Sequence, residues 1–117
     1  MPEKPLIWLG SSRRDLRAFP ALARRLAGFQ VRRVQQGLDP DDWKPMRMVG
    51  PGVREIRIHI AGAHRVFYLA TRAEAIYVLH AFEKKTQKTS ANDLRTGRER
   101  FRAIAKLRQQ HGKEKRG

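Results

Sequence analysis

The sequence predicts an α+β domain in which helices collect on one side of a mostly antiparallel sheet. Apolar residues recur at helical spacing near the N-terminus, four strand-length runs occupy the middle of the chain, and a basic helical pattern follows them. A chain of 117 residues has room for one modest core, so we expect a single domain over residues 1–117.

The first elements are expected to be a short strand and a helical hairpin. The strand is "PLIWLG", and the hydroxyls of Ser11 and Ser12 suit the helix start that follows it. Pro20 fits the first turn of a helix but breaks an interior, which predicts two helices, about 12–18 and 20–36, closed by Gly37. Their apolar positions recur every three to five residues, at Leu16, Phe19, Leu22, Leu26, Phe29 and Val34.

A loop and four strands follow the hairpin. The stretch "LDPDDWKP" has two prolines and no periodicity, which is typical of a surface connection. The runs "MRMVG", "VREIRIHIA", "RVFYLAT" and "AIYVLHAF" are separated by turn signals and predict a four-stranded antiparallel meander. Because side chains alternate along a strand, Ile56 and Ile58 should face the core, and Glu55 and Arg57 the opposite, polar face.

The chain becomes strongly basic after Phe82. Residues 83–117 contain twelve Lys and Arg against four Asp and Glu. Ser90 lies three residues before Asp93, as in a capping box, and begins a predicted helix of about 91–109. Its apolar stripe is Leu94, Phe101, Ile104 and Leu107. We expect this helix to dock on the sheet, and the last residues, "HGKEKRG", to fray.

The charge balance favours a polyanionic partner. The net charge is +15, and 18 of the 26 basic residues are arginines, whose guanidinium suits bidentate phosphate contacts and base stacking. Nucleic acid is therefore the expected partner, and a soluble basic domain with solvated charged faces is the plain alternative. No apolar run is long enough for a signal peptide or a membrane span, so we expect a cytoplasmic protein without a membrane partner.

Several classes of chemistry are excluded by composition. The chain has no cysteine, which removes a disulfide scaffold, a thiolate zinc site and a cysteine nucleophile. The four histidines show no HxH or HExxH spacing, so no metal is expected. Nucleotide and flavin signatures are also missing from the sequence, and we expect no cofactor.

A basic patch on the polar sheet face is the candidate site. Pairing of adjacent strands would gather six side chains in one concave patch: Arg57, His59, Arg65, His80, Lys84 and Lys85. Cations of this kind can stabilise phosphate charge and protonate a leaving oxygen during RNA cleavage. Each residue also has a structural interpretation. The arginines can pair with Glu55, the lysines can be a solvated strand exit, His80 can be a hydrogen-bonded structural residue, and His59 and His64 can be inert, exposed turn residues.

Two stretches, "GVREIRIHIAGAHRVFYLA" and "AIYVLHAFEKKTQKT", resemble the RelE/HigB toxin superfamily, and most closely its phage-derived HigB-like branch. The segment "FPALARRLAGFQVRRVQQGLDPDDWKPM" is similar to the same family, so the resemblance covers about residues 5 to 108. It implies a RelE/ParE-like fold and a type II toxin that cleaves mRNA, usually in the ribosomal A site. It also implies an antitoxin partner, commonly a helix-turn-helix protein of the HigA type.

The resemblance also implies roles for individual residues. Arg65 in "HRVFY" matches the arginine that contacts the scissile phosphate, and Arg57 in "EIRI" matches one of two basic residues on the preceding strand. The other of these is Glu55 here, so the family's basic pair is incomplete. Lys84 or Lys85 in "FEKKT" falls where the family places a basic residue after the last strand. The C-terminal tyrosine proposed as a base in RelE has no counterpart, because the only tyrosines are at 68 and 77.

The function expected from the sequence is therefore a ribosome-dependent mRNA endonuclease acting through 2′-OH attack. Two alternatives stay open. One is a ParE-like toxin that inhibits DNA gyrase without cleaving RNA, and the other is a non-toxic, basic nucleic-acid-binding domain of phage origin. The partners expected from the first interpretation are the antitoxin, mRNA and the ribosome.

Overall fold

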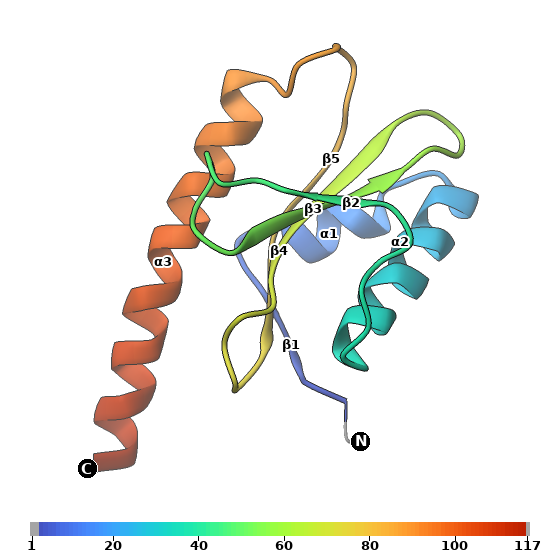
Figure 1. Ribbon diagram of the computed structural model, residues 1–117. Helices are drawn as coiled ribbons and strands as arrows, with labels where there is room; N and C mark the ends of the chain where they lie inside the picture. The colour runs from blue at the N-terminus through green and yellow to red at the C-terminus, as the bar shows by residue number, and fades with distance from the viewer. Residues whose placement is uncertain (1–2, 117) are drawn as a thin grey trace.

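The protein is a mixed five-stranded sheet with helices on both faces (Figure 1). The computed structural model describes the backbone of residues 3–116 and the side chains of residues 3–110. The strands are β1 (Leu6–Trp8), β2 (Trp43–Pro45), β3 (Val53–Ile58), β4 (His64–Leu69) and β5 (Ile76–Glu83). The helices are α1 (Ser12–Arg17), α2 (Ala21–Gln35) and α3 (Ala91–Arg116). The α+β class predicted from the sequence is confirmed.

The sheet order is β1-β5-β4-β3-β2, and only the β1–β5 pair is parallel. The antiparallel meander β3–β4–β5 matches three of the four predicted strands. The sheet has five strands because the first run joins its edge beside β5, with Leu6 opposite Ile76 and Trp8 opposite Val78. The sequence showed this strand but gave no sign of its partner, since parallel pairing joins segments far apart in the chain.

The run "MRMVG" forms a turn, so its assignment as a strand is wrong. The amide of Val49 donates to the carbonyl of Met46 at 3.0 Å, and both side chains are buried as core anchors. The strand at this edge is β2, inside the stretch predicted to be a loop, and Trp43 lies opposite Ile56. Proline is tolerated in β2 because an edge strand needs hydrogen bonds on one side only.

Helices α1 and α2 cover one face of the sheet. The core here joins Leu16 and Phe19 of α1–α2 with Ile56, Val66 and Val78 of the sheet. The buried face of α2 is Ala23, Ala27, Gln30, Val31 and Val34. Of the apolar positions predicted for this face, Leu22 and Phe29 are instead more than half exposed, because the small alanines bring the other side of α2 onto the sheet.

The end of α2 confirms the predicted role of Gly37. Its φ is +83°, its amide donates to Val34 at 3.0 Å, and the amide of Leu38 donates to Arg33 at 2.9 Å. This pair of bonds is a Schellman motif, which satisfies helix carbonyls that would otherwise lack partners. A side chain at this φ would be strained, so glycine is the suitable residue.

Helix α3 covers the opposite face, which corrects the prediction that all helices lie on one side (Figure 1). Ile104 is buried against β3–β5, and Leu94 and Phe101 are half-buried, whereas Leu107 is exposed. Gly97 allows the close approach, since a Cβ there would lie 3.0 Å from Phe67 and Val49 side-chain atoms. The helix lies on this face because the sheet is apolar on both sides, with Phe67, Leu69 and Leu79 facing α3.

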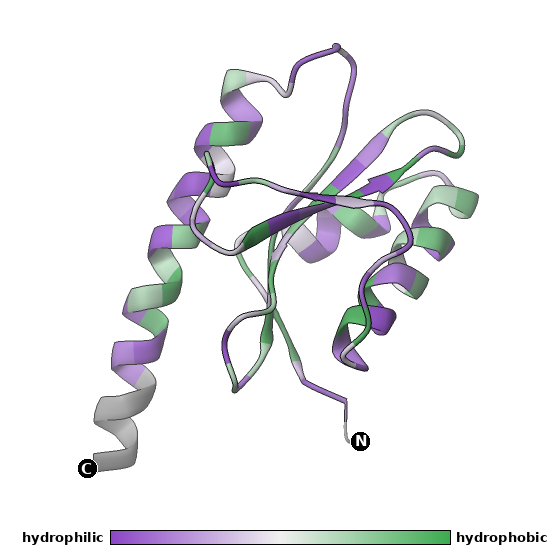
Figure 2. Ribbon diagram, in the orientation of Figure 1, coloured by the Kyte–Doolittle hydropathy of each residue, from purple (hydrophilic) through white to green (hydrophobic). Residues whose placement is uncertain are grey.

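Helix α3 is longer than predicted and continues to Arg116. The side chains of "HGKEKRG" lie outside the described residues, so their predicted fraying remains a prediction. Figure 2 shows hydrophilic and hydrophobic residues alternating along the described part of α3. Within the described chain, no helix has the combination of length and apolar composition that a membrane crossing requires.

Candidate functional site

The sheet face beneath α3 is apolar at one end and charged at the other. Side-chain alternation places Glu55, Arg65 and Phe82 on this face, beyond the apolar residues that α3 covers. Arg57 lies opposite Arg65, and Arg65 lies opposite Phe82 in the strand register. Strands β3 and β4 therefore contribute polar side chains to one region, beside Phe82 of β5.

Glu55 lies at the centre of this region and has no exposed surface. Its Oε1 is 3.4 Å from Nε of Arg65, which is 6% exposed, and 3.8 Å from Nζ of Lys44. Burial raises the pKa of the Glu55 carboxyl, and the charges of Lys44, Arg65, Lys84 and Arg57 offset part of that rise. We call Lys44, Glu55, Arg57, Arg65 and Lys84 the Glu55 cluster.

Arg57 lies at the exposed rim of the cluster and is held by Asp42. Its Nε and Nη2 lie 2.9 and 2.8 Å from Asp42 Oδ1, and Nε2 of His59 lies 3.2 Å from Oδ2 of the same carboxylate. The backbone supports this contact, because the amide of Arg57 donates to the carbonyl of Asp42 at 2.9 Å. His59 thus joins the patch through Asp42, as an exposed residue just after β3.

The structure distinguishes the roles of Lys84 and Lys85, which the sequence alone could not do. The amide of Lys84 donates to the carbonyl of Ala63 at 2.7 Å, so strand pairing continues one residue beyond β5. Alternation then places Lys84 on the same face as Phe82 and His80, where its charge acts on Glu55. Lys85 is exposed and belongs to the opposite side of the strand.

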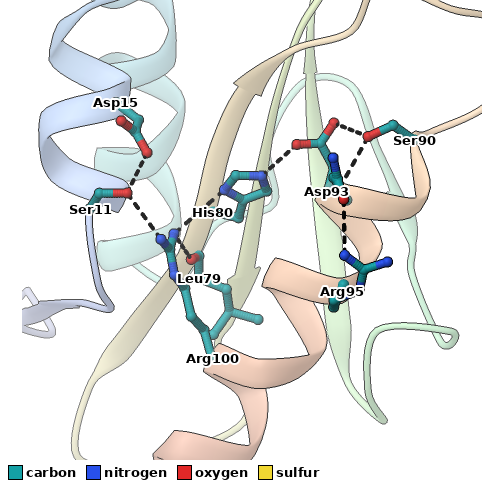
Figure 3. Close-up of polar contacts among 9 residues, drawn as sticks. Ser11, Asp15, Leu79, His80, Ser90, Asp93, Arg95 and Arg100 are labelled. Atoms are coloured by element: carbon teal, nitrogen blue, oxygen red, sulfur yellow. Dashed lines mark hydrogen bonds and ion pairs between the residues drawn. The ribbon is translucent and has the colours of Figure 1, made fainter.

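His80 belongs to a separate set of hydrogen bonds that joins β5, α1 and α3 (Figure 3). Its Nε2 lies 2.7 Å from Asp93 Oδ1, and its Nδ1 lies 3.5 Å from Nη1 of Arg100. Arg100 also donates to Ser11 Oγ at 3.0 Å and to the carbonyl of Leu79 at 2.9 Å. We call the connected side chains the His80 network: Ser11, Asp15, His80, Ser90, Asp93 and Arg100.

Local sequence explains why the His80 network forms. Strand β1 pairs only with residues 76–78, so the carbonyl of Leu79 has no strand partner on that side and accepts from Arg100 instead. Asp93 is held by the predicted cap, since its amide donates to Ser90 Oγ at 3.1 Å and Ser90 Oγ donates to its Oδ2 at 2.7 Å. Asp93 is thereby oriented toward His80.

Both ring nitrogens of His80 are engaged, which fixes its chemistry. A carboxylate can only accept, so Nε2 carries the proton and Nδ1 faces the Arg100 donor. Burial lowers the pKa of His80, and the contact with Asp93 offsets part of that change. The ring also stacks on Phe82, with centroids 4.8 Å apart. These contacts favour the structural interpretation of His80.

Two surface hollows lie outside the Glu55 cluster. One, of about 240 Å³, lies at the end of α2 and is lined by Arg54, Tyr68 and Ile76 among others. The second, of about 480 Å³, is lined by Gly10, Ser11, Arg13, Arg14 and Arg17. Neither includes a residue of the predicted patch, so its concave shape remains a prediction. The second hollow adjoins the His80 network through Ser11 and is rich in arginine.

The structure therefore brings together Arg57, Arg65 and Lys84, places His80 in a neighbouring network, and leaves Lys85 apart. His64 is buried against Phe19, with ring centroids 4.5 Å apart, and is not the exposed turn residue that the sequence suggested. Sequence reasoning missed Lys44 and Asp42, because the strand that presents them looked like a loop. An acidic residue between two arginines on a strand was the available signal for Glu55.

Comparison with protein-family models identifies one family that matches the chain. The family model described as "Phage derived protein Gp49-like (DUF891)" matches residues 14–102, which include most of α1, all of α2, strands β2–β5 and the first part of α3. Both the Glu55 cluster and most of the His80 network lie within the matched range. A search of curated proteins finds no match.

Proposed function

The chain belongs to the Gp49-like family of phage-derived proteins, and from that premise we propose that it is a toxin of a type II toxin–antitoxin pair that cleaves mRNA on the ribosome. The observation that carries the proposal is the gathering of Lys44, Arg57, Arg65 and Lys84 around one carboxylate on a single sheet face. The resemblance to RelE and HigB toxins supports the same assignment.

Arg65 has the central role in the proposed mechanism. The ribose 2′-hydroxyl loses its proton to solvent and its oxygen attacks the adjacent phosphorus. The bond to the 5′-oxygen breaks, that oxygen takes up a proton from solvent, and a 2′,3′-cyclic phosphate remains. In the transition state negative charge grows on the non-bridging phosphate oxygens. Guanidinium donors stabilise such charge best when they are held in place beforehand. Arg65 is held by a hydrogen bond from Nη1 to the carbonyl of His64 at 3.0 Å and by the charge of Glu55. Lys84 and Lys44 add positive charge at the rim.

RNA affinity is expected to come from a wider arginine surface. The hollow lined by Arg13, Arg14 and Arg17 adjoins Ser11, and Ser11 is connected through Arg100 to His80 beside Phe82. Cations along such a path neutralise successive phosphates and release counter-ions. His80 has a positioning role in this scheme, since it keeps Phe82 and the start of α3 in place.

We also propose an acidic antitoxin segment as the protein partner. Leu22 and Phe29 are seven residues apart on α2, lie on one side of the helix, and are more than half exposed. Arg25 and Arg32 are exposed on the neighbouring turns. An amphipathic segment carrying apolar side chains and carboxylates would complement this surface in both shape and charge.

Purified protein added to translating ribosomes tests the proposed function. Cuts in mRNA at fixed positions within codons would support it. Intact mRNA together with inhibited DNA supercoiling would favour the ParE-like alternative. Growth that continues after induced expression would favour a non-toxic binding domain.

A further inference from the structure

The Glu55 carboxylate is buried among cations without a hydrogen bond. Neither Oε1 nor Oε2 has a hydrogen-bond partner among the described residues, and the same holds for Nε of Arg65, 3.4 Å from Oε1. The residue lies on β3, opposite Phe67 of β4 and Lys44 of β2. Four cations act on it: Lys44 of β2, Arg65 of β4, Arg57 of β3 itself, and Lys84, which follows β5.

A carboxylate in this state is costly for the fold. Buried polar groups are nearly always hydrogen-bonded, and a buried ion pair contributes little net stability because both ions lose their hydration. The direction of the Glu55 pKa agrees, since burial favours the neutral acid despite four nearby cations. An unsatisfied buried group in a folded protein calls for an explanation, and a functional role is one of the recognised ones.

We propose that Glu55 is a positioning residue, an internal counter-ion that holds Arg65 and the surrounding lysines in one arrangement until an RNA phosphate takes over their charge. The inference deepens the proposed function and rests on it. Glu55 has no exposed surface, so it acts through Arg65 and does not itself touch the ribose. It replaces a basic residue in the pattern that the RelE resemblance implies, and its negative charge offsets part of the positive charge of the site.

The test is Glu55→Gln, which keeps the shape and removes the charge. Three quantities are measured: thermal stability, affinity for an RNA oligonucleotide blocked by a 2′-deoxy linkage, and the rate of mRNA cleavage on translating ribosomes. We expect stability at neutral pH to be retained and affinity to rise about three-fold, because one partly screened repulsion is lost. The slope of log K against log salt should steepen by up to about 0.7. Cleavage should fall about 100-fold, because Arg65 is no longer oriented.

Opposite changes in affinity and cleavage separate a positioning role from a structural one. A variant that loses stability, affinity and cleavage in parallel would overturn the inference, and so would one that matches the wild type in all three. The control is Glu74→Gln, which removes a carboxylate 2.9 Å from Nε of Arg108, on the far part of α3. It should change neither affinity nor cleavage.

A second variant covers the case in which Glu55→Gln does not fold. Glu55→Asp keeps the charge but moves it back by one methylene, so affinity should stay at the wild-type value while cleavage falls. Unchanged cleavage in Glu55→Asp would overturn the proposal. If the wild-type protein does not cleave mRNA on translating ribosomes, the proposed function fails by itself, whereas the affinity, salt slope and stability of Glu55→Gln still decide whether Glu55 is a counter-ion.

Discussion

The Glu55 cluster and the His80 network are neighbours on one sheet face, joined where Phe82 stacks on His80 and lies opposite Arg65. In the network, each ring nitrogen of His80 has a partner and Asp93 accepts from both His80 and Ser90. In the cluster, Glu55 and Nε of Arg65 interact through charge alone. Hydrogen bonding is thus more complete around His80 than around Glu55.

This difference indicates which group is free to act. A fully hydrogen-bonded network rigidifies the fold, and its members would lose those bonds if they took part in proton transfer. Nε of Arg65 is held to Glu55 only by charge and can exchange this partner for another anion with little loss of directed bonds. Under the proposed function, Arg65 would therefore take part in the chemistry and His80 would support it, and the following variants test that division.

The largest effect is expected for Arg65→Lys. Lysine retains the charge beside Glu55, so the fold should persist, but it lacks the planar donor fork. We expect cleavage to fall about 100- to 1000-fold, as for loss of one preorganised donor. Cleavage of mRNA in a translation extract gives the rate, and circular dichroism confirms folding. Arg95→Lys is the control, since Arg95 is exposed on α3 and donates only to Asn92 among the residues described. Wild-type activity in Arg65→Lys would reverse the assignment.

Asp93→Ala should reduce stability more than activity. It removes the acceptor for His80 Nε2 and the cap contact with Ser90, which together should cost about 2 kcal/mol in the free energy of unfolding. Urea denaturation measures this loss. The control Asn92→Ala changes an exposed neighbour and should stay within about 0.5 kcal/mol of the wild type. Loss of cleavage in Asp93→Ala protein that is still fully folded would give the His80 network a direct catalytic role.

Lys84→Ala and Lys85→Ala form a matched pair. Lys84 faces Glu55, so its loss should slow cleavage about ten-fold, equivalent to about 1.4 kcal/mol. The salt slope of RNA binding should also become shallower by about 0.7. Lys85 lies on the other side of the strand, so Lys85→Ala should change the cleavage rate less than about two-fold. Equal effects of the two substitutions would show that strand alternation does not decide which lysine acts.

The smallest effect concerns the pH dependence of stability. Burial lowers the pKa of His80, so the unfolded chain takes up a proton more readily, and stability is lost as pH falls from about 6.5 toward the folded pKa. Burial also lowers the pKa of His64, which therefore contributes to the pH dependence of stability in the same direction. Glu55 acts oppositely: its raised pKa adds stability as pH falls through the folded value.

Melting curves of the wild type, His80→Gln and Glu55→Gln between about pH 4 and 8 measure these contributions. Relative to His80→Gln, the wild type should lose stability below about pH 6.5, by about 1 kcal/mol or less. Relative to Glu55→Gln, it should gain stability as the pH falls. If the stability of the wild type relative to each variant changed in the same direction as the pH falls, the contrast between the two regions would be contradicted.

Much of the fold was predictable because its signals are local. The helix boundary at Gly37, the cap formed by Ser90 and Asp93, and the three central strands follow from patterns within a few residues. Strand β1 was predicted but its pairing with β5 at the sheet edge was not, and β2 lay in a stretch predicted to be a loop. The residues of β1 and β2 become strands through pairing with β5 and β3, and their own sequences are three residues long.

The candidate site was predictable in the same partial way. Alternation along β3 and the family resemblance identified Arg57 and Arg65, because both depend on short stretches of sequence. The choice between Lys84 and Lys85 required knowing where strand pairing ends. The role of His80 required Asp93 and Arg100, which lie on another element.

The sequence by itself determined the charge of +15, the alternation that places Glu55 and Arg57 on one face of a strand, and the helical periodicity of the N-terminal and C-terminal segments. Tertiary structure alone decided that Glu55 is fully buried and that Lys44, Arg65 and Lys84 surround it. The physical reason is that burial and ion pairing depend on neighbours in space. Those neighbours come from β2, from β4 and from the residue that follows β5, and they are up to forty positions apart in the chain, the separation of Lys44 and Lys84.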